Sequence, residues 1–419
     1  MDSDLIRRKV AELEGELIRI RRDLHRHPEL GFEEHRTASV IAKWLNHCDV
    51  RVREGVVGTG VVGVIEGGRP GRTIGVRVDI DALNISDNKD VAYASSIPEL
   101  CHACGHDVHT TIGLGVAKIV AELRSEFAGA VKLIFQPAEE VPKPLPGKER
   151  DVYTEYPKGQ RAADLAIKEG VLEDPRLDRL LGIHCWPSLK AGQIGYEYGP
   201  AMAGNGNFHI AVLGRGGHAA TPHRTIDPMP IMAEVILALQ TIISRKTEPG
   251  SRLVVTIGTI HGGRRRSIIS DRVDITGTVR GLDTTVLEKE VSHYIERMVK
   301  GITEAHGAGY ICEYGLDIPP VINDDDVVRD TSISLRKILG NDAVELKEAP
   351  MTAEDFSYMA RLVPSIYMKL GTANENESTR FPLHNPNFDV DEACIACGVR
   401  GILQVIFDFL EQPRPILHA

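Results

Sequence analysis

The chain has few cysteines, no long apolar run and no excess of basic residues. Its net charge of −10 argues against a nucleic-acid-binding protein, which normally carries a basic face. The acidic start of the chain lacks the apolar core of a signal peptide, and no run of about 18 apolar residues predicts a membrane span. Seven cysteines, an odd number unevenly spread, fit reduced thiols better than a disulfide framework. We therefore expect a cytoplasmic protein that binds neither nucleic acid nor membrane.

The length of 419 residues favours two domains, because a single core rarely grows so large. Apolar residues recur every three or four positions over 6–24, which predicts an amphipathic helix, and a second helix is expected over 110–123. Apolar segments at 73–79, 131–135 and 180–183 predict strands. This alternation predicts an α/β fold with a mostly parallel, mixed sheet flanked by helices.

The middle of the chain has a different pattern, in the order strand, helix, strand, strand, helix, strand. The six segments are 208–212, 228–244, 253–260, 273–280, 286–302 and 310–314. This is the ferredoxin-like order, and it predicts an inserted α+β domain over 198–314. Residues 1–197 and 315–419 would then form the first domain. The Pro- and Lys-rich stretch 141–159 is expected to be a long loop.

Polar residues of the ligand type stand at the ends of three predicted strands. Asp79 and Asp81 follow one strand, Glu139 and Glu140 follow another, and His184 follows a third. In open α/β sheets, ligands bind at the carboxyl edge of the strands. Three independent strands that deliver such residues to one edge therefore predict a functional site there.

The segment 100–109 concentrates metal-binding side chains, with two Cys, three His and one Asp in ten residues. Thiolate, imidazole and carboxylate are the ligands of borderline-soft divalent metals. The paired carboxylates Glu139-Glu140 lie further along, with Glu140 36 residues past Cys104. One carboxylate can hold a metal while its neighbour moves protons. The combination indicates metal-assisted hydrolysis, provided that more ligands come from elsewhere in the chain.

Eight motifs, which span nearly the whole chain, resemble one family in the correct order. They are His27-Pro28-Glu29-Leu30-Gly31-Phe32-Glu33-Glu34, His102-Ala103-Cys104-Gly105-His106-Asp107, Gln136-Pro137-Ala138-Glu139-Glu140, Gly182-Ile183-His184-Cys185-Trp186-Pro187, Gly216-Gly217-His218-Ala219-Ala220, Gly277-Thr278-Val279-Arg280, Glu354-Asp355-Phe356 and Leu383-His384-Asn385-Pro386. The family is that of the aminoacylase and carboxypeptidase-G-like metallohydrolases. The branch resembled contains bacterial N-acyl-amino-acid amidohydrolases, auxin-conjugate hydrolases and p-aminobenzoyl-glutamate hydrolase.

The resemblance implies a catalytic domain with two divalent metal ions and an inserted lid or dimerisation domain. The implied metal ligands are Cys104, His106, Glu140, His184 and His384. Glu139 would be the general base, and Asp81 would orient a metal ligand. A Cys/His/Glu site suits Zn, Mn, Co or Ni.

The resemblance also implies roles for residues of the inserted domain. The matching histidine in the family, here His218, reaches the active site of the partner subunit and stabilises the oxyanion, which implies a homodimer or higher oligomer. Arg280 matches a position that grips a substrate carboxylate. Ser267 stands where the branch usually has a substrate-binding Asn, and His223 is a further substrate-binding candidate with a structural role as the alternative. The run Arg264-Arg265-Arg266 could serve an acidic substrate or form a solvated turn.

Several other residues of the ligand type are expected to be structural. Those expected to be buried or supporting are Cys101, Cys185, Cys394, Cys397, His25, His27, His209 and His109, and those expected to be solvated are Glu33, Glu34 and residues 324–326. For Asp79 two roles are left open, support of a metal ligand and a purely structural role. For Glu354 and Asp355 a helix-capping role competes with a place in the site.

Together these patterns predict a metal-dependent amidohydrolase that cleaves the amide bond of N-acyl or N-aroyl amino acids. A carboxypeptidase or dipeptidase that uses the same site is the closest alternative. A non-catalytic binding protein of the same fold is the alternative from another class, and the presence of Glu139 and of all five implied ligands argues against it. The acyl group, the amino-acid side chain and the physiological metal are left open.

Overall fold

The computed structural model describes residues 1–140 and 161–412, so the predicted loop at 141–159 lies outside the described residues. A mixed eight-stranded sheet forms the centre of the larger domain, in the order β1-β2-β4-β3-β5-β16-β6-β15. Its strands are β1 (Arg51–Val56), β2 (Gly60–Glu66), β3 (Arg69–Asp79), β4 (Ala128–Gln136), β5 (Arg179–Lys190), β6 (Ile194–Tyr196), β15 (Ala343–Glu345) and β16 (Ser365–Ala373). The central pairs β3–β4, β3–β5 and β5–β16 are parallel, as the sequence predicts.

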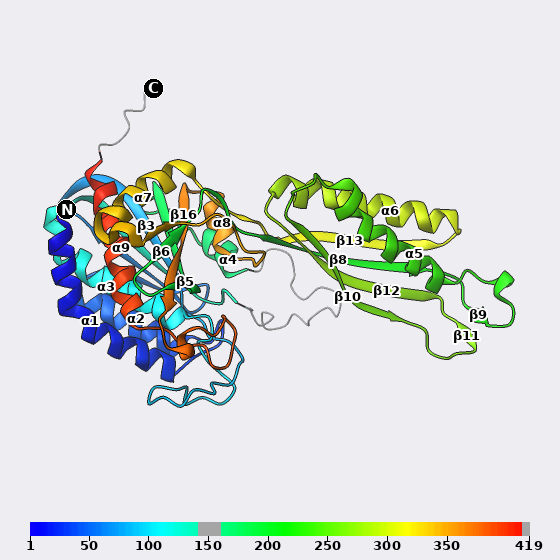
Figure 1. The fold of residues 1–419 in the computed structure, drawn as a ribbon, viewed down its shortest axis with the longest axis horizontal. Coiled ribbons are helices and arrows are strands. Elements are labelled where there is room, and N and C mark those ends of the chain that lie inside the picture. Colours follow the sequence, from blue (N-terminus) through cyan, green and yellow to red (C-terminus); the bar gives the residue numbers. More distant parts are fainter. Residues whose placement is uncertain (141–160, 413–419) are drawn as a thin grey trace, which may run out of the picture.

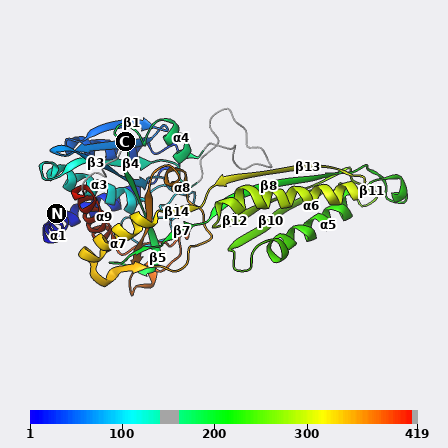
Figure 2. The same cartoon turned by 90° about the horizontal axis from the view of Figure 1, so that it is seen from above.

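Helices cover both faces of this sheet (Figures 1 and 2). One face packs against α1 (Ser3–Arg26), α2 (His35–His47), α3 (His106–Glu122), α7 (Asp325–Leu339) and α9 (Ala393–Glu411). The other face packs against the short helices α4 (Ala162–Lys168) and α8 (Phe356–Ala360). Buried residues at Ile6, Val10, Leu13 and Leu17 give α1 an apolar stripe at helical spacing. The layered α/β architecture follows from these two apolar cores.

Helix α9 is long and apolar enough to cross a membrane by length and composition alone. In the structure, however, 83% of its apolar window is buried inside the fold, against α1, α3 and α7. Helix α9 is therefore the central helix of the core, and it is apolar because it is buried there.

A second sheet belongs to a separate unit, residues 204–318, which we call the lid. Its elements are β8 (Gly204–Leu213), α5 (Pro228–Thr241), β10 (Leu253–Gly262), β12 (Arg272–Gly281), α6 (Val291–Ala305) and β13 (Gly309–Ile318). The sheet order is β10-β12-β8-β13, with antiparallel pairs throughout, and both helices pack on one apolar core. The lid extends away from the larger domain in Figure 1, and the hairpin-like pair β9 (Gly217–His218) and β11 (Ile268–Ile269) forms its distal tip. The element order is the predicted ferredoxin-like one; the boundaries at 198 and 314 stay predictions.

Two short strands, β7 (Gly199–Met202) and β14 (Val321–Asn323), pair where the chain enters and leaves the lid. Two predicted element bounds were wrong. Strand β5 continues to Lys190, so His184 lies within a strand and not at its end, because the segment after His184 still pairs with β16. Helix α3 begins at His106 and not at residue 110, so the last motif residues are already helical.

Candidate active site

The carboxyl ends of β3 and β4 lie side by side and bring together the two predicted pairs of acidic residues. Asp79, the last residue of β3, pairs in register with Gln136, the last residue of β4. The chain beyond β4 then returns beside the chain beyond β3, since the backbone N–H of Glu140 donates to Asp81 Oδ2 at 3.1 Å. Adjacent parallel strands thus place four carboxylates, separated by about 60 residues in the chain, at one edge.

The turn before α3 presents Cys104 and His106 to the same edge. Gly105 between them has φ +85°, and a Cβ there would lie 2.7 Å from Cys185 Sγ, so glycine is required on both counts. His106 occupies the first turn of α3. Its Nδ1 lies 3.0 Å from Asp81 Oδ1, so the Nδ1–H donates to that carboxylate and Nε2 keeps a lone pair toward the site. The predicted orienting role of Asp81 fits this contact.

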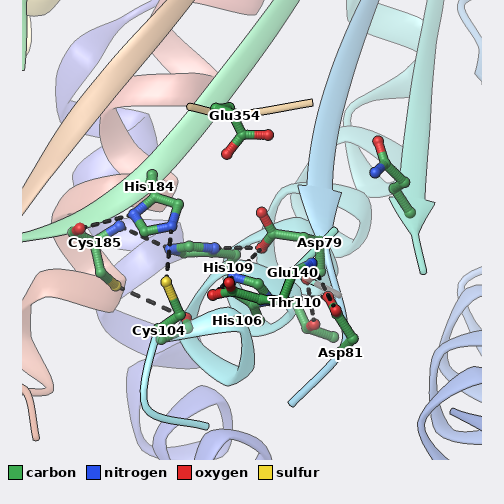
Figure 3. Close-up of polar contacts among 12 residues, drawn as sticks. Asp79, Asp81, Cys104, His106, His109, Thr110, Glu140, His184, Cys185 and Glu354 are labelled. Carbon is green, nitrogen blue, oxygen red and sulfur yellow. Dashed lines mark hydrogen bonds and ion pairs between the residues drawn. The ribbon is translucent and has the colours of Figure 1, made fainter. Parts of the chain in front are cut away.

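The five predicted ligands converge. Atoms of Cys104, His106 and Glu140 lie within 4.8 Å of one another. His184 Nε2 lies 3.3 Å from Cys104 Sγ, and His384 Nε2 lies 2.9 Å from Glu140 Oε1. Figure 3 shows Cys104 and His106 at the start of α3 gathered with Glu140 and His184 from two other segments of the chain.

The chemistry of this donor set fits divalent cations. His184 Nδ1–H donates to the Cys185 carbonyl at 2.8 Å, and burial lowers the pKa of His184 to about 3, so its Nε2 faces the site as a neutral donor atom. His106 Nε2 is buried with no hydrogen-bond partner among the described residues. Burial and the neighbouring Glu140 carboxylate raise the pKa of the Cys104 thiol, so a cation is needed to hold the thiolate. The residues therefore form a site that offers soft and borderline donors to a divalent cation.

Glu139 lies beside this cluster and is buried in a second acidic group with Glu354 and Asp355. Burial and the charge of Glu354 raise the pKa of Glu139 well above its usual range. Its neighbour Glu140 differs, because although burial opposes its charge, the hydrogen bond and charge of His384 lower the pKa of Glu140 to about 2. The two neighbouring carboxylates are thus distinguished by their surroundings, one poised to carry a proton and the other held as an anion.

A buried arginine, Arg77, binds three of the acidic side chains around the site. Arg77 donates to Asp79 at 2.9 Å and to Asp355 at 2.7 Å, and its guanidinium lies 3.1 Å from Glu354. Glu354 also accepts from the Phe356 N–H at 2.9 Å, at the start of α8, but the N-cap residue of this helix is Asp355, which makes no side-chain cap hydrogen bond. Of the two competing interpretations, the place of Glu354 in the cavity wall is the one that the structure favours.

Asp79 and His109 support the ligands without facing the cavity. His109 Nδ1 lies 2.5 Å from Asp79 Oδ1, and His109 Nε2 accepts from the Cys185 N–H at 2.8 Å. Both nitrogens of this ring are therefore occupied, and its expected supporting role fits. Asp79 binds His109 and Arg77 together and so links the strand end to α3.

One interpretation of acidic residues was wrong. Glu34 was expected to be solvated, yet it is 0% exposed. It accepts from the Ala138 N–H at 2.9 Å and from the Thr59 hydroxyl at 2.5 Å, and burial raises its pKa to about 8. It holds the turn that leads to Glu139, and the helical pattern around Glu34 gave no sign of that tertiary contact. Of the other residues expected to be buried or supporting, Cys101, Cys185, Cys394, Cys397, His25 and His209 are buried, whereas His27 is partly exposed at the end of α1.

A cavity of about 380 Å³ opens between the metal-type cluster and the lid. At one end it is lined by Cys104, Glu139, Glu140, His184, Glu354 and His384. At the other end it is lined by Arg161, Asn205, Arg280 and Ile318, and Trp186, Met202 and Leu383 give it apolar walls. Predicted Arg280 is thus in the cavity, whereas Arg161 and Asn205 were not predicted because neither belongs to a recognisable motif.

The remaining predicted residues lie elsewhere. His218 pairs with Ile268 at the distal tip of the lid, and the Ala219 N–H donates to the Ser267 carbonyl at 3.1 Å. His223 follows in the same exposed tip. Figure 1 shows this tip at the end of the lid away from the large sheet, so within one chain His218, Ser267 and His223 do not reach the cavity.

Comparison with known proteins agrees with this geometry. The model of a family described as peptidase family M20/M25/M40 matches residues 75–408. An N-acyl-L-amino acid amidohydrolase of Geobacillus stearothermophilus is 38% identical over 326 residues, which cover 78% of this chain and 83% of the relative. Thermostable carboxypeptidase 2 of Saccharolobus solfataricus is 35% identical over 94% of this chain and 95% of its own. The solved structure of the Bacillus subtilis YXEP protein, a dinuclear metal-binding peptidase of the M20 family, superposes with a TM-score of 0.80 at 29% identity, covering 96% of this chain and 99% of that one.

Proposed function

Because this chain belongs to peptidase family M20/M25/M40 and is a hydrolase of amide bonds, we propose that it cleaves the amide bond of N-acyl amino acids. The observation that carries the proposal is the convergence of five donor side chains next to a separately buried carboxylate, Glu139. This arrangement offers a cation site and a proton carrier side by side at one end of the cavity. Two divalent ions held by Cys104, His106, Glu140, His184 and His384 would activate water and polarise the amide carbonyl.

The residues of the chain then have distinct tasks. Glu139 takes a proton from the attacking water and returns it to the leaving amine, because it faces the cavity and no hydrogen bond of the described residues holds its side chain. The raised pKa of Glu139 suits a carboxylate that accepts a proton from water. Asp81 keeps His106 in the tautomer whose Nε2 faces the site. Zn, Mn, Co or Ni would match this donor set.

The substrate is placed by the opposite end of the cavity. Arg280 lies there half-buried and would bind the α-carboxylate of an N-acyl amino acid through its planar fork. Trp186, Met202 and Leu383 offer apolar contact to the remaining groups. Similarity to a thermostable carboxypeptidase keeps cleavage of a peptide bond in a C-terminal or dipeptide substrate as the second candidate, since both substrates end in a carboxylate.

The third component is an oxyanion donor. His218, which is exposed at the tip of the lid, is the residue that the family resemblance implies for this role. A second copy of the chain that brought its His218 into this cavity would complete the site, so a cytoplasmic homodimer formed through the lid is part of the proposal.

A substrate screen tests the proposed function directly. The metal-reconstituted protein should hydrolyse a panel of N-acyl amino acids, and chelation should abolish the activity. Dipeptides in the same panel separate the two candidates. Absence of turnover on every N-acyl amino acid, with metal content demonstrated, would reject the proposal.

A further inference from the structure

The lid end of the cavity is built by three neighbouring strands. In the antiparallel registers Arg280 of β12 lies opposite Asn205 of β8, and Asn205 lies opposite Ile318 of β13. Residues directly opposite each other project from the same face of a sheet. The three side chains therefore form one row, and all of them line the cavity.

Strand β13 is irregular next to this row. Leu316 pairs with Gly206 and Ile318 pairs with Asn205, so Asp317 is an extra residue with no opposite partner, a β-bulge. Bulges re-aim a side chain away from the regular alternation. The Asp317 carboxylate turns toward Arg161, which donates through Nη2 at 2.5 Å and Nε at 3.3 Å.

This ion pair joins the lid to the larger domain. Arg161 precedes α4, and the side chains of Arg161 and Asp317 are only 8% and 11% exposed. The Asp317 carbonyl also accepts a hydrogen bond from the Tyr358 hydroxyl of α8, which fixes the bulge. Because the pair is buried and Arg161 donates two hydrogen bonds to Asp317, it is stronger than an ion pair exposed to solvent.

The charges at this end leave one positive charge in excess. Arg161 and Arg280 contribute two guanidinium groups and Asp317 contributes one carboxylate, among the described lining and its contacts. Arg280 has no hydrogen-bond or ion-pair partner in residues 1–140 and 161–412, and burial is the main reason that its pKa is lowered. Asn205 is 8% exposed, and its Oδ1 has no hydrogen-bond partner among the same residues. The unpaired guanidinium of Arg280 and the unsatisfied amide of Asn205 lie in one row and can therefore both bind a ligand.

We infer that Asp317 sets the specificity of the cavity by neutralising Arg161, so that the lid end accepts one carboxylate and disfavours a second. The inference rests on the proposed function, and it names the substrate class as N-acyl amino acids with uncharged side chains. The single α-carboxylate would bind Arg280, with the amide of Asn205 beside it. An acidic side chain would find Arg161 already paired with Asp317, whose carboxylate does not line the cavity but repels a second negative charge brought to Arg161.

The test uses two substrates that differ in charge alone, N-acetylglutamate and N-acetylglutamine. The ratio of kcat/KM for the glutamate substrate to that for the glutamine substrate should be below one in the wild-type enzyme. Asp317→Asn should raise this ratio at least about tenfold, because it removes the repelling negative charge beside Arg161. The change should lie mainly in KM, since the charges act on substrate binding and not on the reacting atoms.

Two further variants separate charge from structure. Arg161→Gln leaves Asp317 unpaired and should raise KM for N-acetylglutamine at least about tenfold, since the excess positive charge is then lost. The double variant Arg161→Gln with Asp317→Asn restores one excess positive charge and should return the ratio toward the wild-type value. A merely structural pair would instead give equal losses on both substrates.

Glu288→Gln is the matched control. Glu288 pairs with Arg361 at 3.1 Å, also between the lid and the larger domain, but Arg361 does not line the cavity, whereas Arg161, the partner of Asp317, does. The substrate ratio should not change in this variant. A wild-type preference for the acidic substrate, or an unchanged ratio in the folded Asp317→Asn variant, would overturn the inference. Turnover of N-acetylglutamine by the wild type under those conditions would leave the proposed function intact.

Discussion

The two ends of the cavity are built in different ways. The metal-type end takes most of its residues from short motifs at strand ends and at the start of α3, and its His106 and His184 rings are each oriented by a buried neighbour. The lid end takes Arg161, Asn205 and Arg280 from three separate segments, and a β-bulge aims Asp317 at Arg161. The difference teaches that the reaction chemistry is encoded locally, whereas the charge balance that would choose the substrate depends on how two domains meet.

The largest expected effect of substitution is at the paired glutamates of the metal-type end. Glu139→Gln should retain metal and lose kcat by about 10²- to 10⁴-fold, because general acid–base catalysis contributes that much. Glu140→Gln should instead lose metal, since it removes a ligand held as an anion. Metal analysis and steady-state kinetics on both variants provide the measurement. Equal metal loss in both variants would show that the two roles are confused.

The support beneath the metal-type end should be costly to remove. Arg77→Met leaves three buried carboxylates without their shared cation, so we expect the free energy of unfolding to fall by about 3–5 kcal/mol. Urea unfolding of the chelated proteins measures it. Arg361→Met, which breaks an exposed interdomain pair, is the control and should change stability by less than about 1 kcal/mol. A small loss in Arg77→Met would mean that these carboxylates are protonated and need no partner.

The distal tip of the lid should behave as part of a distant active site. His218→Ala should bind metal normally and lose about 10²- to 10³-fold in kcat, the usual effect of an oxyanion donor. Mixing it with Glu139→Gln protein gives heterodimers in which one site carries both lesions and the other carries neither. Part of the activity should therefore return on subunit exchange. Exchange without recovery would contradict action across subunits, and His306→Ala on the lid surface controls for nonspecific effects.

The last expected effect, a gradual one, is a pH dependence of stability at His25. Burial and Arg21 oppose a charge on this ring, but Asp107 at 2.7 Å and Asp87 outweigh them and raise the pKa of His25 to about 10. The folded state therefore binds a proton more tightly than the unfolded state, whose His titrates near about 6.5. This stabilisation is complete below about pH 6.5 and declines toward pH 10, by up to about 1.4 kcal/mol per pH unit.

Urea unfolding of the chelated protein at about pH 7 and about pH 9.5 measures this slope. His25→Asn should remove most of it, while the exposed His47→Asn should leave it unchanged. A slope that survives in His25→Asn would place the titrating group elsewhere.

Much of the fold could be predicted from the sequence because its signals are local. The spacing of apolar residues predicts the buried strands and the amphipathic helices. The order of these elements in turn predicts the parallel sheet, the ferredoxin-like lid and the sheet edge at which Asp79, Glu140 and His184 meet. Contacts between distant segments had no such signal. The burial of Glu34 against Ala138 and the continuation of β5 past His184 both depend on partners that spacing does not reveal.

By itself the sequence therefore determined the kind of chemistry, because the donor types and the glycine at 105 must occur where a metal-binding turn requires them. The tertiary structure alone decided which charges face each other. Arg77 pairs with Glu354 and Asp355, His384 lowers the pKa of Glu140, and Asp317 turns to Arg161, each across more than 100 residues. Electrostatic interactions depend on distance and burial in space, and neither quantity is written in the order of the residues.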